Sequence, residues 1–191
     1  MMLRAIALSL ALWGLVPMAA TAAVLPEAAV AQVGRGEVWV RVVQAGKAAR
    51  ITAAIEIDAP PQRVWAVMTD CAQAKRIIAN LTVCRTVERG AGWDVREQVT
   101  RGNLFVPTLR NLVRSDYQPH RMIRFRSVGG DVQVMEGFWR LEPIRGGQGT
   151  RVIYESKVQA PIAAPASVVR AGLRADCAKV LGNLRRISEA G

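Results

Sequence analysis

The stretch IEIDAPPQRVWAVMTD, residues 55–70, decides the fold, because a strand pattern changes there into a helix pattern. Ala59-Pro60-Pro61 ends the strand. Proline is tolerated in the first turn of a helix, since the N–H group that it lacks has no partner there. Apolar side chains within residues 64–68 give the helix one apolar side, and Asp70 can cap a second short helix over residues 72–78. We therefore predict a strand followed directly by two short helices.

Strand patterns flank this stretch on both sides. Residues 37–44 are rich in Val, and residues 50–58 alternate between apolar and polar side chains, so these two runs predict a hairpin. Beyond the short helices, further strands are predicted over residues 84–89, 93–101, 109–117, 122–128, 132–141 and 150–159. Their links have hairpin length, which favours an antiparallel sheet, because parallel strands need long crossover connections.

The chain ends in a predicted amphipathic helix that follows Pro161 and Pro165. Its apolar residues recur at spacings of three and four. They are Val169, Leu173, Cys177, Val180, Leu181, Leu184 and Ile187. One helix cannot cover so wide a twisted sheet unless the sheet curls around it. We therefore predict an α+β fold in which a curved antiparallel sheet of about seven strands wraps around the long C-terminal helix, with the two short helices between the first and second strands and a cavity between the layers.

These elements resemble the START-like, Bet v 1-like helix-grip (SRPBCC) superfamily. The resemblance rests on residues 55–70, on Asn80-Leu81 before Cys84, on the run GFWRLEPIRGGQGTRVIYES at residues 137–156, and on the tail at residues 168–187. It is strongest for the polyketide cyclase/dehydrase and lipid-transport branch, which includes coenzyme Q-binding START-like domains. It implies a helix-grip domain over residues 36–191 with a hydrophobic cavity between sheet and helix.

Composition narrows the function classes. The chain has 191 residues, 51% hydrophobic, and a formal net charge of +11. One His and no Cys-x-x-Cys pair argue against a zinc site, and we predict no metal and no cofactor. His120 has no nucleophile at a recognisable motif spacing, so we interpret it as a solvated turn residue.

Arginine supplies 22 of the 26 basic residues. Arg110, Arg114, Arg124 and Arg126 alternate along two strands, which predicts that they lie on the outer face of the sheet. That face is either simply solvated or attracted to an anionic membrane surface. Nucleic acid is not a predicted partner, because the aromatic residues are not interleaved with the basic ones.

The N-terminus has the pattern of a secretory signal, residues 1–22. Arg4 precedes an apolar run at residues 5–16, and Ala20-Thr21-Ala22 offers a cleavage site. Ala29-Val30-Ala31 is a second such site. An uncleaved membrane anchor is the alternative. We predict export, with the periplasm as the expected compartment and secretion as another, and we interpret residues 23–35 as a lead-in.

Export changes how the cysteines are interpreted. Cys71 and Cys84 flank the second short helix and can pair in an oxidising compartment. Cys177 lies on the apolar stripe of the last helix. The alternative is three buried free thiols.

A set of residues is predicted to line the implied cavity, although plain core packing is the alternative for each of them. The set consists of Trp93, Val95, Glu97, Val99, Phe105, Phe125, Met135, Trp139, Tyr154, Val169 and Leu173. Glu97 shares its alternation face with Val95 and Val99, so if buried it needs a partner or a raised pKa. With the opposite strand register it lies in solvent. Glu97 and Tyr154 are the two weak catalytic candidates.

Three functions fit these observations. The preferred one is an exported carrier or sensor of a hydrophobic small molecule, a lipid or an isoprenoid-like compound. The second is a cyclase- or dehydratase-like enzyme acting on a polyketide-type substrate. The third is an envelope protein that docks through its basic face.

Overall fold

The computed structural model describes residues 25–102, 107–159 and 164–190. The predicted signal segment, residues 1–22, lies outside the described residues. The helices are α1 (Glu27–Gly34), α2 (Pro61–Thr69), α3 (Cys71–Ile77) and α4 (Ala166–Glu189), with a short 3-10 helix η1 (Arg145–Gly147). The strands are β1 (Trp39–Ala45), β2 (Ala48–Ile57), β3 (Leu81–Gly90), β4 (Trp93–Thr100), β5 (Leu109–Gln118), β6 (Met122–Gly130), β7 (Val134–Ile144) and β8 (Gly149–Gln159).

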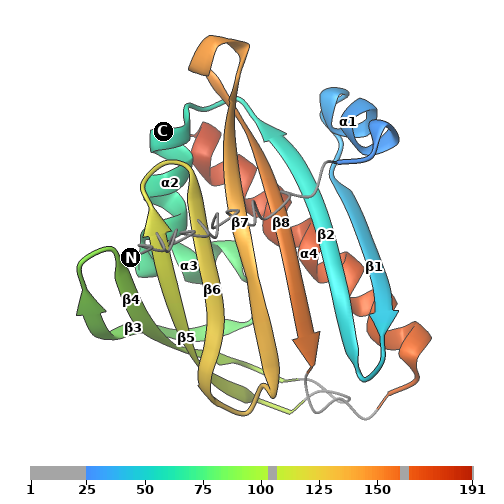
Figure 1. Ribbon diagram of the computed structural model, residues 1–191, viewed down its shortest axis with the longest axis vertical. Helices are drawn as coiled ribbons and strands as arrows, with labels where there is room; N and C mark the ends of the chain where they lie inside the picture. The colour runs from blue at the N-terminus through green and yellow to red at the C-terminus, as the bar shows by residue number, and fades with distance from the viewer. Residues whose placement is uncertain (1–24, 103–106, 160–163, 191) are drawn as a thin grey trace, which may run out of the picture.

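One antiparallel sheet contains all eight strands in the order β1-β2-β8-β7-β6-β5-β4-β3. The sheet curves around α4, which crosses behind β1, β2 and β8 in Figure 1, while α3 lies against β3 and α2 packs on α3 and α4. The predicted α+β helix-grip fold is therefore confirmed. The runs 37–44 and 50–58, predicted as a hairpin, are β1 and β2, and together with the six later strands they make eight rather than about seven. Because β1 counts as the first strand, the two short helices lie between the second and third strands, β2 and β3.

The main core lies on the concave side of the sheet. The inward residues of β2 meet the apolar stripe of α4, where Leu181 and Leu184 are almost completely buried. Burying one such side chain contributes about 1.5–3 kcal/mol. Along the apolar stripe of α4, Cys177 is the first buried residue. The earlier turns of the helix extend past the sheet and remain largely exposed.

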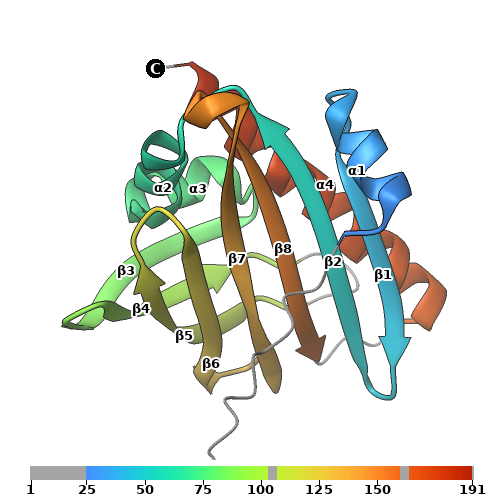
Figure 2. The same ribbon diagram turned by 45° about the horizontal axis from the view of Figure 1, so that its top comes forward.

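A second, smaller core lies on the convex side. Leu25, Ala29 and Val33 of the N-terminal segment pack against Ala54 and Ile153, which face away from α4. Residues 23–35, interpreted from sequence only as a lead-in, thus include the helix α1, which Figure 2 shows lying against the outside of β1 and β2. Sequence periodicity missed this helix because it is short and rich in alanine.

Asp70 fixes the junction between α2 and α3, as its position in the sequence predicts. Its side chain accepts a hydrogen bond of 2.8 Å from the backbone N–H of Ala72, which caps α3. At the other end of α3, the Asn183 side chain of α4 donates to the carbonyl of Ile77 at 3.0 Å. These two contacts hold α3 over the edge of the concave face.

Gly137 allows β7 to approach β8 closely at the centre of the sheet. A Cβ atom built there would meet the backbone of Glu155 and lie 2.8 Å from the Cα atom of Ser156. We predict that Gly137→Ala lowers the unfolding free energy by about 3 kcal/mol in denaturant titrations, because the backbone must move to admit the methyl group.

Gly182→Ala is the matched control. A Cβ atom at Gly182 in α4 meets nothing within 4 Å. This variant should be neutral or up to about 1 kcal/mol more stable, since alanine favours the helix. Equal stability of the two variants would contradict the close approach of β7 and β8.

Candidate functional site: a cavity under the last helix

A cavity of about 330 Å³ lies between the concave face of the sheet and the helices α3 and α4. Ligand pockets in proteins begin at about this size. Its walls come from β2, β4–β8, α2, α3 and α4. They are formed by Ile51, Met68, Ala74, Ile77, Ile78, Arg96, Gln98, Val113, Ser115, Tyr117, Ile123, Phe125, Met135, Trp139, Tyr154, Leu173, Asp176, Cys177, Val180 and Leu184. Most of these side chains are apolar.

Three aromatic rings form one continuous wall on β6, β7 and β8. The Tyr154 ring lies 4.1 Å from the Trp139 ring and stacks with the Phe125 ring at 5.9 Å, measured between centroids. The strands bring these rings side by side because the three residues have the same inward phase. Such a wall suits the flat face of a ring or an extended hydrocarbon chain.

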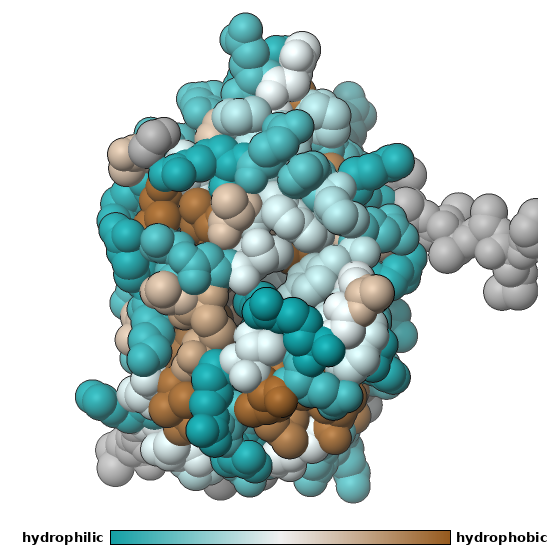
Figure 3. All heavy atoms as spheres, turned by 90° about the vertical axis from the view of Figure 1, so that its left-hand side faces the viewer, coloured by the Kyte–Doolittle hydropathy of each residue, from teal (hydrophilic) through white to brown (hydrophobic). Residues whose placement is uncertain are grey.

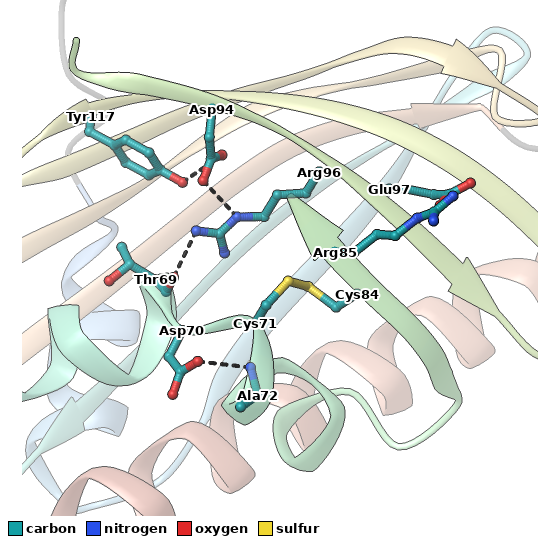
Figure 4. The surroundings of a disulfide bond; sticks show 10 residues. All are labelled: Thr69, Asp70, Cys71, Ala72, Cys84, Arg85, Asp94, Arg96, Glu97 and Tyr117. Carbon is teal, nitrogen blue, oxygen red and sulfur yellow. Dashed lines mark hydrogen bonds and ion pairs between the residues drawn. A yellow bond between two sulfur atoms is a disulfide. The ribbon is translucent and has the colours of Figure 1, made fainter. Parts of the chain in front are cut away.

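The end of the cavity away from the aromatic wall is polar, and Figure 4 shows its groups. Arg96 of β4 forms an ion pair with Asp94 at 2.8 Å and donates to the carbonyl of Thr69 at the end of α2 at 2.7 Å. The Tyr117 hydroxyl donates to Asp94 at 2.8 Å, and burial raises the pKa of Tyr117 to about 12. Because the guanidinium has five N–H groups and these contacts use two of them, Arg96 keeps donors for a ligand.

A disulfide fastens α3 to the sheet beside this polar end. Cys71, the first residue of α3, is bonded to Cys84 of β3, with Cα atoms 5.5 Å apart (Figure 4). The predicted cysteine pair is therefore present. Since Ala74, Ile77 and Ile78 line the cavity, the disulfide anchors the part of the chain that covers it.

The remaining cysteine lies on the opposite side of the cavity. Cys177 of α4 is a buried free thiol in the cavity wall near Tyr154. Burial raises the pKa of Cys177 to about 12, so the thiol is protonated at neutral pH. Burial also raises the pKa of Tyr154, whose accessible surface faces the cavity. Both groups can therefore donate hydrogen bonds, and neither can serve as a base.

The structure brings five of the predicted site residues together in the cavity wall: Phe125, Met135, Trp139, Tyr154 and Leu173. Val169 is only partly buried one turn before Leu173 and is not part of the wall. Phe105 lies outside the described residues.

The prediction for β4 needs a correction. Trp93, Val95, Glu97 and Val99 lie on the face opposite the cavity, while Arg96 and Gln98 point into it. Figure 4 shows Arg96 and Glu97 extending in opposite directions from neighbouring positions. Glu97 accordingly cannot act on a molecule in the cavity.

Arginine side chains explain why the outer face of β4 resembles an inner one in the sequence. Arg114 lies over the Trp93 ring at 4.1 Å and is the cross-strand partner of Val95. The apolar stem of an arginine covers hydrophobic neighbours while its charge stays in water. Val95 is therefore buried without facing the cavity, and alternation alone gives the wrong phase.

Glu97 is covered in the same way. It is 5% exposed, yet the side chains of its ion-pair partners Arg85 and Arg110 are 68% and 52% exposed. The carboxylate thus lies at the surface beneath two guanidinium groups rather than in the interior. Hydrogen bonds from Arg85 and Arg110 hold its pKa below the ordinary value.

Sequence reasoning missed the polar end of the cavity, formed by Asp94, Arg96, Gln98, Ser115 and Tyr117. The sequence does contain a signal for this polar end. Within residues 93–100, three polar side chains stand at alternate positions and therefore share one face of the strand. A polar face on a strand is usually interpreted as solvent-facing, so only the closed geometry reveals it.

The face of the molecule at the left of Figure 1 is mostly hydrophilic. Figure 3 shows the side of the molecule at the left of Figure 1, where apolar residues form separate patches among hydrophilic ones. On β6, Arg124 and Arg126 are exposed while Ile123 and Phe125 are buried, as predicted. In the residues that the structure describes, no helix has the length and apolar character needed to cross a membrane.

Comparison with known families agrees with this geometry. The family model described as polyketide cyclase / dehydrase and lipid transport matches residues 48–189. The chain belongs to this family. The match begins at the first residue of β2 and ends at the last residue of α4, so α1 and β1 precede it. Family and fold together support a domain that binds a hydrophobic ligand.

Solved structures share the fold at low sequence identity. A STAR-related lipid transfer protein from Xanthomonas axonopodis is 14% identical, with 79% of this chain and 92% of that chain covered and a TM-score of 0.66. Human STARD10 is 16% identical, with coverage of 79% and 68% and a TM-score of 0.66. The Zhui aromatase/cyclase from Streptomyces sp. R1128 is 18% identical, with coverage of 74% and 94% and a TM-score of 0.60. No curated protein matches the sequence.

The Glu97 ion pairs predict a specific acid sensitivity. Because the folded-state pKa is lowered from the ordinary 4.5, Glu97 stabilises the fold fully above that pH, and this contribution disappears as the pH falls through the lower folded-state value. In urea titrations at a series of pH values, Glu97→Gln should be less stable than wild type near neutral pH. The difference should shrink in acid. A difference that stays constant or grows in acid would contradict the ion pairs.

The disulfide predicts a response to reductant. Replacing both Cys71 and Cys84 by Ala should lower the unfolding free energy by about 3 kcal/mol, the loop-closure contribution for a loop of this length. A thiol reductant should destabilise wild type by a similar amount and leave the double variant unchanged. Equal sensitivity of both proteins to reductant would refute the assignment.

Proposed function

We propose that the protein is exported and carries or senses a hydrophobic small molecule, a lipid or an isoprenoid-like compound, in the cavity under α3 and α4. The observation that carries this proposal is an apolar cavity of about 330 Å³ with polar groups confined to particular places on its wall. A well-packed core does not leave such a volume, because interiors are normally filled to crystal-like density.

The volume limits the ligand. A cavity of 330 Å³ corresponds to roughly eleven water molecules at about 30 Å³ each. It suits one ring system or one chain segment, and a lipid with two long acyl chains would have to leave most of its length outside. The aromatic wall of Phe125, Trp139 and Tyr154 favours a planar or extended apolar body.

The polar end limits the head group. Asp94 balances the charge of Arg96, so the end as a whole is close to neutral and attracts a group that accepts hydrogen bonds more than it attracts a full negative charge. A carbonyl, ether or hydroxyl oxygen fits the remaining N–H donors of Arg96 and the side chain of Gln98, which also lines the cavity.

One feature of the described residues supports export, and another bears on the cleavage site. The Cys71–Cys84 disulfide suits an oxidising compartment, the periplasm in our proposal. In addition, cleavage after Ala22 leaves α1 intact, whereas cleavage after Ala31 removes Leu25 and Ala29 from the convex core. We therefore favour the first cleavage site.

A cyclase- or dehydratase-like enzyme is the second candidate, since a solved neighbour is named an aromatase/cyclase. Tyr154 is the one catalytic candidate from the sequence that reaches the cavity. Burial raises its pKa, so it can donate a proton or a hydrogen bond but cannot accept a proton at neutral pH. With Glu97 on the opposite face, the predicted acid–base pair of Glu97 and Tyr154 does not meet in the cavity.

Docking of the basic face on an anionic membrane has weaker support. Several of the outer arginines are engaged in ion pairs, for example Arg110 with Glu97 and Arg114 with Asp116. Such pairs lower the net positive charge that the face presents to a membrane.

Filling the cavity tests the proposal. Leu173 lies in its wall, and Val168 is 52% exposed on the same helix outside it. We predict that Leu173→Trp weakens uptake of a fluorescent single-chain lipid by about tenfold or more, because the indole occupies the ligand volume. Val168→Trp should bind as wild type.

Two further results would decide the matter. The mature protein purified from its host should release a reproducible small molecule on organic extraction and mass spectrometry. Wild-type uptake by Leu173→Trp, or a wild type that binds no hydrophobic probe, would overturn the proposal.

A further inference from the structure

A buried carboxylate lies directly behind Arg96 and outside the cavity wall. Asp94, two residues earlier on β4, is 2% exposed and does not line the cavity. One of its oxygen atoms accepts a hydrogen bond from Nε of Arg96 at 2.8 Å, and the other accepts one from the Tyr117 hydroxyl at 2.8 Å (Figure 4). A ligand therefore cannot reach Asp94, but the negative charge of Asp94 acts on any group that Arg96 binds.

The contacts of Arg96 leave one part of its guanidinium group for a ligand. Its Nε atom donates to Asp94, and its Nη2 atom donates to the carbonyl of Thr69 at 2.7 Å. The N–H groups that these two bonds do not use are two on Nη1 and one on Nη2. Such donors can bind the oxygen of a neutral head group or of an anionic one, so the balance of charge decides between the two.

A second carboxylate lies at the edge of the cavity. Asp176 of α4 lines the cavity and is exposed to solvent. Among the described residues of the wall, Arg96 and Asp176 are the two that carry a charge. With Asp94 behind the wall, one positive charge is accompanied by two negative ones. An anionic head group that enters loses its hydration and meets no uncompensated positive charge, whereas a neutral oxygen loses much less.

We propose that Asp94 is a specificity-determining residue that makes the cavity select uncharged ligands and reject anionic ones. It acts by neutralising Arg96 and does not touch the ligand itself. This inference rests on the proposed function, since it requires that the cavity binds a hydrophobic molecule. It narrows the ligand class to neutral compounds such as long-chain alcohols, ketones or ethers, and excludes free fatty acids and lipid phosphates.

The compounds 1-decanol and decanoate are suitable probes, because they have the same chain length and differ in the charge of the head group. At pH 8 decanoate is ionised, since an ordinary carboxyl group has a pKa of roughly 4. Binding is measured by the change in tryptophan fluorescence, because Trp139 lies in the cavity wall. Wild type should bind 1-decanol about tenfold or more tightly than decanoate. An alcohol leaves water more easily than a carboxylate in any case, so the decisive quantity is the change of this preference in variants.

Two variants remove a carboxylate near the cavity. Asp94→Asn keeps the shape of the side chain and an acceptor oxygen for Arg96, but leaves the guanidinium charge uncompensated. It should bind decanoate about tenfold more tightly than wild type does, through a charge-assisted hydrogen bond, and should change 1-decanol binding by less than about threefold. Asp176→Asn should raise decanoate affinity by only about twofold, because that charge is exposed and screened by salt.

Glu97→Gln is the matched control. Glu97 is also a buried carboxylate of β4 that pairs with arginines, so its replacement changes the charge of the protein by the same amount. It extends away from Arg96 on the opposite face of the strand (Figure 4). This variant should keep the wild-type preference for 1-decanol to within about twofold.

The results distinguish this inference from the proposed function. If wild type binds decanoate as tightly as 1-decanol, if a folded Asp94→Asn keeps the wild-type preference, or if Glu97→Gln shifts the preference as much as Asp94→Asn does, the charge-selection inference is wrong while the proposed function stands. Should Asp94→Asn fail to fold, an unchanged decanoate affinity of Asp176→Asn refutes the inference instead. If neither probe binds and Leu173→Trp also has no effect on lipid uptake, the proposed function fails as well.

Discussion

The architecture depends on the burial of one apolar stripe of α4 against a sheet that is wider than the helix. The stripe from Cys177 to Ile187 packs on β1 and β2, at one side of the sheet. The strands β4 to β7 continue beyond the reach of the helix, and the twist of the sheet brings them back towards it. The space between those strands and α4 cannot be filled by the helix alone, and this geometric mismatch creates the cavity.

The remaining cover comes from α3, a helix of seven residues that is too short to be stable on its own. Three attachments compensate for its length: the Asp70 cap, the disulfide to β3 and the Asn183 contact with α4. The polar end of the cavity lies directly beside these attachments, since Arg96 also binds the carbonyl of Thr69 just before Asp70. The residues that hold the cover and the residues that can bind a head group therefore belong to one connected region.

Polar groups inside the cavity and arginines outside it have complementary roles in this sheet. On β4, Asp94 and Arg96 neutralise each other on the inside, whereas on the outside long arginine side chains cover Trp93, Val95 and Glu97. The high positive charge of the chain is thus used in part to cover the convex face of the sheet, on which α1 is the only helix among the described residues. Because charged heads stay in water while their stems pack, this cover requires no additional helix.

The sequence by itself determined the element order, the position of the helix–strand boundary at Pro60-Pro61, the apolar stripe of α4, the cysteine pair and the inward phase of β6 to β8. These features depend on local periodicity, on proline and on spacing, which act within a few residues of the chain. The tertiary structure alone decided which face of β4 lines the cavity and that residues 27–34 form a helix on the convex side. Alternation divides a strand into two faces but does not say which is inside, because an arginine on a neighbouring strand can bury an outer valine as effectively as the core buries an inner one.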